Sequence, residues 1–461
     1  MLTIKTLLTQ LSIHQEATIH GWVKNKRGSK NVIFVTLQDG SCFSPLQVVI
    51  DPTQFKENLC KQITVGASLR ITGKIVASPG GEQQKELSAT HITILGHAPS
   101  DYPLQPKRHT LAFMRTIQHL RLRTNTFSAV FRVRHALSYA IHTFFHQKGF
   151  LWIHTPIITS VDAEGAGEVF GITSKEKEGN FFGKKVALTV SGQLPGEAAA
   201  LSLGKIYTFG PTFRAENSNT PRHLAEFWMV EPEIAFYTLK ENIALAIDMI
   251  KYCLRHALTH CKEEMAFLEK RMMYENKQKG QSTTRPLREH LTAIVSKDFT
   301  HITYTDAIAL LKEVHTKAPQ HFPDGIVPWG EDLQTTHERY LTKHFDGGVV
   351  VTNYPKGIKA FYMRQNDDGK SVAAMDILLP DVGEIVGGSQ REERLDLLKA
   401  AITHMGLDLK ELAWYLDTRR FGTVPHSGFG LGFERLVLLV TGMDNIRDVI
   451  PFPRTPNHAM C

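Results

Sequence analysis

The sequence has little that would place the chain in a membrane or in a fold held by disulfides. No apolar run is long enough to cross a bilayer, and the first residues lack the basic and then apolar order of a secretory signal. The five cysteines are widely spaced, which fits neither a disulfide framework nor a zinc site. We therefore expect a chain of the reducing cytoplasm that has no membrane partner.

Length and charge indicate more than one domain and a basic N-terminal region. A chain of 461 residues, 42% of them hydrophobic, can bury at least one large core, and its length favours two or more domains. The formal net charge is +7, yet residues 1–125 alone hold 15 Lys and Arg against 7 Asp and Glu. This local excess favours a phosphate-backbone partner, although a solvated basic surface explains the charge equally well.

Short alternating segments in the basic region predict a small barrel. They lie at residues 18–24, 31–37, 46–50 and 68–76, and turns rich in Gly, Asp and Pro separate them. Oligonucleotide-binding barrels use aromatic and polar groups on a strand face to stack on unpaired bases and to read them. Phe34 is either such a group or a core residue, as isolated aromatics on strands more often are. The basic run at residues 24–27 favours the nucleic-acid role.

A proline-containing connector at residues 101–126 separates this region, at residues 1–100, from the rest of the chain, because prolines stiffen the path and prevent helix continuation. From Phe127 to about Lys148, apolar residues recur at helical spacing, and Gly149 supplies a stop. A strand follows at residues 150–156. We expect a second domain at residues 127–461, with a charged, helical segment at about 261–300 to which no chemical role can be given.

Two segments of the second domain predict a site for a polyanion. Residues 207–217 and 220–233 read as two strands joined by a polar loop, with charged and apolar groups alternating at period two. Residues 428–436 hold closely spaced glycines, which let a strand approach a ligand before a helix carries Arg435 into the same cleft. Arg214, from the first segment, and Arg435 are expected to share one ligand.

These segments resemble motifs 2 and 3 of the class II aminoacyl-tRNA synthetases. Residues 213–216, Phe-Arg-Ala-Glu, resemble the motif 2 arginine segment, and residues 430–435, Gly-Leu-Gly-Phe-Glu-Arg, resemble motif 3. The helix and strand at residues 127–156 resemble motif 1. Within the class, the chain is similar to the aspartate, asparagine and lysine subgroup, and most closely to its asparagine-specific members, over about residues 19–456. The motifs are long enough to make chance agreement a poor explanation.

The resemblance implies an α+β protein in which an OB-fold anticodon-binding barrel precedes a catalytic domain built around an antiparallel sheet. It also implies a homodimer formed through motif 1. The implied reaction is ATP-dependent activation of asparagine to asparaginyl-adenylate, followed by transfer to the 3′ end of tRNA(Asn). In the barrel, Phe34 would stack on an anticodon base and Gln47 would hydrogen-bond one.

The resemblance also implies roles around ATP. Arg214 would bind the α-phosphate, where a guanidinium can donate two parallel hydrogen bonds, and Arg435 would bind the γ-phosphate. Glu384 and Asp376 would hold Mg²⁺, because a phosphate-bridging magnesium selects carboxylate oxygens. In the alternative, Glu384 pairs with Arg391 and Asp381 makes a turn. The other implied contacts with ATP are those of Glu216, Arg222, His223 and Phe227.

Substrate choice depends on a few positions. In the segment comparable to residues 190–197, the aspartate enzymes carry a lysine that pairs with the substrate carboxylate, and here that place is Gly196. Arg391 would donate to an amide oxygen, while Glu231, longer than its counterpart in the aspartate enzymes, would accept from the amide nitrogen. The α-amino group would be held by Glu164, Ser191 and Gln193.

Two alternatives remain open from the sequence. An aspartyl-tRNA synthetase of relaxed specificity would need a cation to replace the missing lysine. A non-catalytic RNA-binding relative would have no use for Arg214, Glu384 and Arg435 together.

Overall fold

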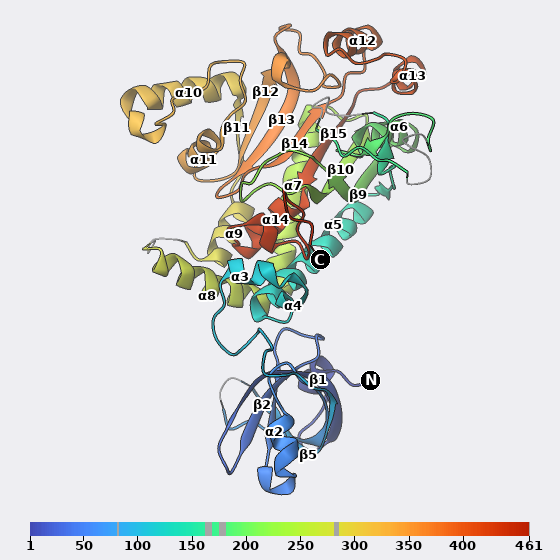
Figure 1. Ribbon diagram of the computed structural model, residues 1–461. Coiled ribbons are helices and arrows are strands. Elements are labelled where there is room, and N and C mark those ends of the chain that lie inside the picture. The colour runs from blue at the N-terminus through green and yellow to red at the C-terminus, as the bar shows by residue number, and fades with distance from the viewer. Residues whose placement is uncertain (81–82, 162–167, 175–180, 281–284, 461) are drawn as a thin grey trace. The chain divides into compact units, whose positions relative to one another are not determined.

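The chain forms two compact units, residues 1–129 and 130–461, in a computed structural model (Figure 1). The structure describes residues 1–80, 83–161, 168–174, 181–280 and 285–460. The first unit includes the connector predicted at residues 101–126. The predicted domain limits, 1–100 and 127–461, stay predictions.

The first unit contains a closed barrel whose strands are hydrogen-bonded in the order β1-β2-β3-β5-β4. Buried and half-exposed residues alternate along β2 and β3, which is why the sequence pattern could predict these strands. Helix α1 (Ile4–Gln10) packs Ile4 and Leu7 into the barrel core, and α2 (Glu57–Gln62) adds Cys60. The strands are β1 (Glu16–Gly28), β2 (Ile33–Gln38), β3 (Leu46–Ile50), β4 (Ser68–Ala77) and β5 (Lys85–Gly96).

The connector contains two short helices that its prolines did not lead us to expect, α3 (Leu111–Thr116) and α4 (Gln118–Arg121). Both begin after the last proline of the connector, so they agree with the rule that proline interrupts helices. The Lys24 ammonium of β1 donates to the Arg123 carbonyl at 2.8 Å and to Asn125 Oδ1 at 2.6 Å, which attaches the end of the connector to the barrel.

The second unit is built on an eight-stranded sheet of order β11-β12-β13-β14-β15-β10-β9-β6. The six central strands are antiparallel, as predicted, whereas the edge pairs β11–β12 and β6–β9 are parallel. The strands are β6 (Leu151–Trp152), β9 (Lys205–Phe213), β10 (Glu226–Ala235), β11 (Thr300–Thr303), β12 (Val349–Pro355), β13 (Ser371–Leu379), β14 (Gly383–Gln390) and β15 (His426–Gly432); β7 (Ile158–Thr159) and β8 (Ala187–Leu188) form a separate pair.

Three predicted strands extend further into loops than the strands of the structure do. β9 ends at Phe213 and β10 begins at Glu226, so residues 214–225 form a loop, which the Arg214 N–H closes by donating to the Ala225 carbonyl at 3.0 Å. β6 covers only two residues of the predicted strand at 150–156. Polar and proline residues in both segments disfavour ladder pairing.

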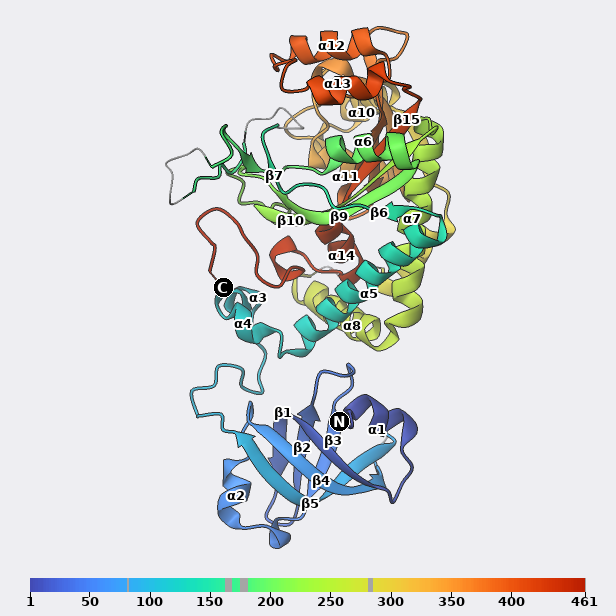
Figure 2. The ribbon, with the colours of Figure 1, turned by 90° about the vertical axis from the view of Figure 1, so that its right-hand side faces the viewer.

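Helices cover both faces of this sheet. Figure 2 shows α5 (Asn125–Gln147), α7 (Leu239–His260) and α14 (Phe433–Thr441) on one face and α6 (Gln193–Leu203) with α13 (Ala413–Arg420) on the other. The predicted helix at 127–148 is α5, and two helices, α8 (Lys262–Gln278) and α9 (Leu287–Ser296), lie within the charged segment predicted at 261–300. The remaining helices are α10 (Tyr304–Lys317), α11 (Thr335–His344) and α12 (Leu395–His404).

Two predicted absences can be compared with the described part of the chain. None of its helices combines the length and the apolar character needed to cross a membrane. The four cysteines that the structure describes, Cys42, Cys60, Cys253 and Cys261, form no disulfide.

Candidate active site and anticodon face

The two predicted phosphate-binding arginines converge on one carboxylate. Arg435, in the first turn of α14, donates from Nη1 to the Glu384 carbonyl at 2.8 Å and lies 3.4 Å from Glu384 Oε2. Burial alone would raise the pKa of Glu384, but Arg435, Lys359 and Arg214 outweigh it and lower this pKa below its ordinary value. The alternative in which Glu384 pairs with Arg391 is therefore wrong.

The loop after β9 brings further predicted residues to the same place. The Arg214 guanidinium carbon lies 5.4 Å from the ring centroid of Phe227, within cation–π range. Burial lowers the pKa of His223, and the charges of Arg435, Arg214 and Arg222 lower it further against the opposing charge of Glu216. A cluster of cationic groups therefore surrounds this end of the site, and it suits a polyanion.

Arg222 is anchored across the site, because its Nη2 donates to the Asp381 carbonyl at 3.0 Å. Asp381 has φ of 69°, which places it in the left-handed region of a tight turn between β13 and β14. The turn predicted at Asp381 thus exists, and it fixes the arginine of the neighbouring loop.

Asp376 and Glu384, the predicted metal ligands, lie close together. A Cβ on Gly387 would be 3.1 Å from Glu384 Oε1 and 3.4 Å from Asp376 Oδ1, so both carboxylates close around this glycine. Asp376 Oδ2 is 2.9 Å from Lys359 Nζ. In the described part of the chain, no group of three or more His, Cys, Asp or Glu has metal-binding geometry. Two carboxylates fit Mg²⁺, which keeps several waters and is completed by substrate phosphates.

Glu338 of α11 was not predicted and joins this acidic region. Its Oε2 accepts from the Glu384 N–H at 3.3 Å. Burial, together with the charges of Glu384 and Asp376, raises the pKa of Glu338 to about 7. It lies outside every motif, so the sequence offered no signal for it.

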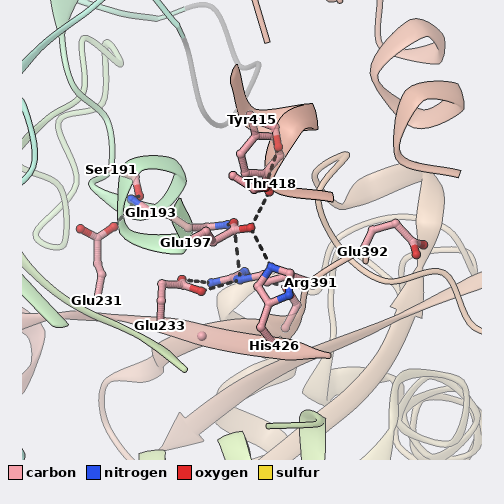
Figure 3. Close-up of polar contacts among 12 residues, drawn as sticks. Ser191, Gln193, Glu197, Glu231, Glu233, Arg391, Glu392, Tyr415, Thr418 and His426 are labelled. Atoms are coloured by element: carbon pink, nitrogen blue, oxygen red, sulfur yellow. Dashed lines mark hydrogen bonds and ion pairs between the residues drawn. The ribbon is translucent and has the colours of Figure 1, made fainter. Parts of the chain in front are cut away.

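At the other end of the site, Glu231 is held by three donors. The Ser191 hydroxyl donates to its Oε1, and Figure 3 shows these two side chains next to each other. The Gly192 N–H and the Thr208 hydroxyl donate to its Oε2, each at 3.0 Å. Ser191 and Glu231, which were predicted to bind different groups of the amino acid, are thus brought together. Glu164 lies outside the described residues.

The carboxylate bonded to Arg391 is Glu233, two residues beyond Glu231. Arg391 donates from Nε to Glu233 Oε2 at 3.1 Å, from Nη2 to Glu233 Oε1, and from Nη1 to Ser389 Oγ at 2.8 Å. Burial raises the pKa of Glu233 to about 8, against the pull of Arg391. Period two on β10 places Glu231 and Glu233 on one face, and this signal could have identified Glu233.

Gly196 lies beside the same carboxylate. A Cβ at this position would meet Glu233 Cγ at 3.5 Å. A lysine there, as in the aspartate enzymes, would extend along Glu233 and bring a cation to the Arg391 end of the site. Its absence leaves Arg391 as the cation that Glu233 binds.

In the barrel, Phe34 and Gln47 lie on one outer face. Phe34 is half-buried and does not belong to the barrel core, so the core interpretation is wrong. The Arg27 guanidinium carbon is 5.6 Å from the Phe34 ring centroid, and Arg27 Nη2 donates to Gln47 Oε1 at 3.2 Å. Glu86, which was not predicted, accepts from Gln47 Nε2 at 2.7 Å and fixes the orientation of this amide.

Comparison with known proteins identifies the chain. A family model described as tRNA synthetases class II (D, K and N) matches residues 112–456, and one described as an OB-fold nucleic acid binding domain matches residues 17–95. The asparagine–tRNA ligase of Cytophaga hutchinsonii is 52% identical over 473 residues, covering 99% of this chain and 98% of the relative. The chain belongs to the asparagine–tRNA ligase family. The ligase of Bacteroides fragilis is 53% identical over 456 residues, or 96% and 95% of the two chains.

The fold agrees with this membership. The asparaginyl-tRNA synthetase of Pyrococcus horikoshii, complexed with asparaginyl-adenylate, has a TM-score of 0.87 at 31% identity and covers 99% of this chain and 98% of its own. The predicted family, the ligase class and the α+β fold with an OB barrel are therefore confirmed. The roles of individual residues stay predictions.

The ligase also has a pocket of about 870 Å³ beside the motif 1 segment, where apolar side chains are mixed with charged ones, Arg134, Glu226, Glu231 and Arg454. Its lining includes His142 of α5 together with Trp152, Ile157, Trp228 and Phe452. Trp152 is 49% exposed and Ile157 43% exposed. Large exposed apolar side chains gathered in one place mark an interaction surface.

Proposed function

We propose that this ligase joins asparagine to ATP in a cleft along β10 and then transfers the amino acid to tRNA(Asn). One observation carries the proposal. Alternate residues of a strand share one face, so Phe227, Glu231 and Glu233 lie along the same face of β10. Phe227 is beside the phosphate-binding cluster, and Glu233 is beside Arg391. A polyanion and a small polar side chain can therefore be bound side by side.

Adenylate formation is an in-line attack of the asparagine carboxylate on the α-phosphorus, which requires aim and charge stabilisation and little proton transfer. Arg214 stabilises the crowded α-phosphate, and Arg435 holds the γ-phosphate. Phe227, whose ring Arg214 already adjoins, stacks on the adenine ring. The loop between β9 and β10 completes the ATP site with Glu216, Arg222 and His223.

Glu384 and Asp376 would hold Mg²⁺ against the ATP phosphates. The bound ion would neutralise charge on the phosphate oxygens. Arg435 remains hydrogen-bonded to the Glu384 carbonyl, so it can support the carboxylate while its other donors face the γ-phosphate.

The other end of the cleft selects the amino acid. Arg391 donates to the side-chain oxygen, and Glu231 accepts from the amide nitrogen, with Glu233 keeping Arg391 in place. Ser191 and Gln193, with Glu164, hold the α-amino group. An aspartate would bring a second negative charge against Glu231, without the lysine that Gly196 replaces.

The barrel and the surface beside α5 are where the macromolecular partners bind. Phe34 and Gln47 read the anticodon of tRNA(Asn) on a face that also carries Arg27. A second copy of the chain packs against the exposed Trp152 and Ile157 beside α5 and gives a homodimer. We place this homodimer in the cytoplasm.

Charging of tRNA(Asn) with labelled asparagine tests the function directly. The full chain should give ATP-dependent, acid-precipitable aminoacyl-tRNA, and omission of ATP should abolish it. A chain that binds tRNA without charging it would instead support the RNA-binding alternative.

A further inference from the structure

Glu197 is a fully buried carboxylate that no role in the reaction explains. It lies on α6, one turn beyond Gln193, and reaches side chains of α13 and β15 and also Arg391, which directly follows β14 (Figure 3). A charge in this position is stable only when partners satisfy it. Burial alone would raise the pKa of Glu197, but Arg419, His426 and Arg391 outweigh it and hold this pKa well below its ordinary value.

The two oxygens of Glu197 have different partners. Oε2 accepts from the Tyr415 hydroxyl at 2.6 Å and from Arg419 Nη2 at 2.6 Å, and lies 3.2 Å from His426 Nε2. Oε1 accepts from Gln193 Nε2 at 2.9 Å and lies 3.8 Å from Arg391 Nε. One oxygen is thus anchored to the scaffold, and the other faces two residues of the amino-acid site.

We propose that Glu197 is a positioning residue that sets Gln193 and Arg391 for asparagine. An ionised carboxylate can only accept hydrogen bonds, so it turns the Gln193 amide until its NH₂ faces Glu197. The Gln193 carbonyl oxygen then faces the site as an acceptor for the α-ammonium of the substrate. The same oxygen of Glu197 helps Glu233 to hold the Nε edge of Arg391, which leaves the outer edge of the guanidinium for the side-chain oxygen.

This inference rests on the proposed roles of Gln193 and Arg391. It adds that one residue, Glu197, orients the groups that bind the α-ammonium and the side chain of asparagine. The i, i+4 spacing of Gln193 and Glu197 on α6 makes their contact local. Arg419 and Tyr415 of α13 provide the distant anchor, so that α13 contributes to asparagine binding without touching the substrate.

Glu197→Gln tests the proposal, because glutamine keeps the size of the side chain and can donate as well as accept. In asparagine-dependent ATP–pyrophosphate exchange by the full chain, the KM for asparagine should rise at least about tenfold, while the KM for ATP should stay within about twofold. Equal effects on both KM values would overturn the proposal, since they would indicate general loss of structure.

Glu392→Gln is the matched control. Glu392 is also fully buried and paired with an arginine, but its partner is Arg394, at 2.7 Å. The Glu392→Gln variant should lower thermal stability about as much as Glu197→Gln and leave the KM for asparagine unchanged. An equal rise in that KM would contradict a special role for Glu197.

Succinamate, which is asparagine without its α-amino group, probes the orientation of Gln193. By calorimetry, removal of this group should weaken binding to the parent chain about tenfold more than binding to Glu197→Gln, because the variant no longer fixes an acceptor toward the ammonium. The same loss in both proteins would overturn the inference. If Glu197→Gln does not fold, Tyr415→Phe keeps the charge and should shift both readouts in the same direction, by about threefold.

Arg391→Lys separates this inference from the proposed site. If Arg391→Lys raises the KM for asparagine and Glu197→Gln does not, the positioning role alone fails. If neither variant changes it, the proposed amino-acid site fails as well.

Discussion

The two ends of the cleft differ in burial more than in charge. At the phosphate end, the side chains of Arg435 and Glu384 are 31% and 40% exposed. At the amino-acid end, those of Arg391 and Glu233 are 2% and 1% exposed. An open cationic end can receive a large polyanion, whereas a buried network cannot rearrange at low cost and therefore discriminates. We therefore propose that activation takes place at the open end and that the amino acid is selected at the buried end.

The largest effect is expected at the open end. Arg214→Ala should lower the rate of asparagine-dependent pyrophosphate exchange by about 100- to 1,000-fold, since an oxyanion-type donor contributes about 2.7–4 kcal/mol in the transition state. The fold should stay intact by circular dichroism. Arg255→Ala, an exposed arginine of α7, should have no effect. Exchange within a few-fold of the parent would remove Arg214 from its role.

The phosphate end could be predicted from the sequence because its residues lie in two continuous motifs. Arg214 and Phe227 flank one hairpin loop, and Arg435 follows a strand that pairs with the strand of Glu384. The barrel was predicted for a similar reason, since alternation along each strand is a local property.

The amino-acid end could be predicted only in part. Arg391 and Glu231 were found through the family resemblance, but Glu233 and Glu197 were not. Glu197 meets Arg419 only after α6 and α13 pack together across more than 200 positions of sequence. No local pattern encodes such a contact, because it depends on how distant helices pack against the sheet.

A smaller effect is expected at the buried end. Glu231→Gln should lower the ratio of kcat/KM for asparagine to that for aspartate by roughly 10- to 100-fold, because it removes one negative charge that opposes the substrate carboxylate. Total activity should also fall, since three donors now face an amide. Glu226→Gln, on the same strand and the opposite face, is the control. An unchanged ratio in an active variant would mean that the amide is read elsewhere.

The barrel should influence neither end. Phe34→Ala should weaken aminoacylation of tRNA(Asn) by about 1–3 kcal/mol of lost stacking, and pyrophosphate exchange without tRNA should stay close to that of the parent. A comparable loss of aminoacylation and of pyrophosphate exchange would contradict the separation of anticodon binding from adenylate formation.

The metal requirement should belong to the open end alone. Glu384→Gln should raise the Mg²⁺ concentration that gives half-maximal exchange by about five- to tenfold, because one carboxylate ligand is lost. Asp381→Asn, in the adjoining turn, should leave that concentration unchanged. Direct Mn²⁺ titration followed by electron paramagnetic resonance, with ATP present, should show weaker Mn²⁺ binding by Glu384→Gln than by Asp381→Asn. Weaker binding by Asp381→Asn would instead place the metal site at the turn.

Pyrophosphate exchange with asparagine, aspartate and lysine in parallel tests the central claim most directly, because all three share the open end and differ only at the buried end. The account predicts strong exchange with asparagine and near-background exchange with the other two. Exchange with aspartate or lysine that equals or exceeds that with asparagine would contradict it.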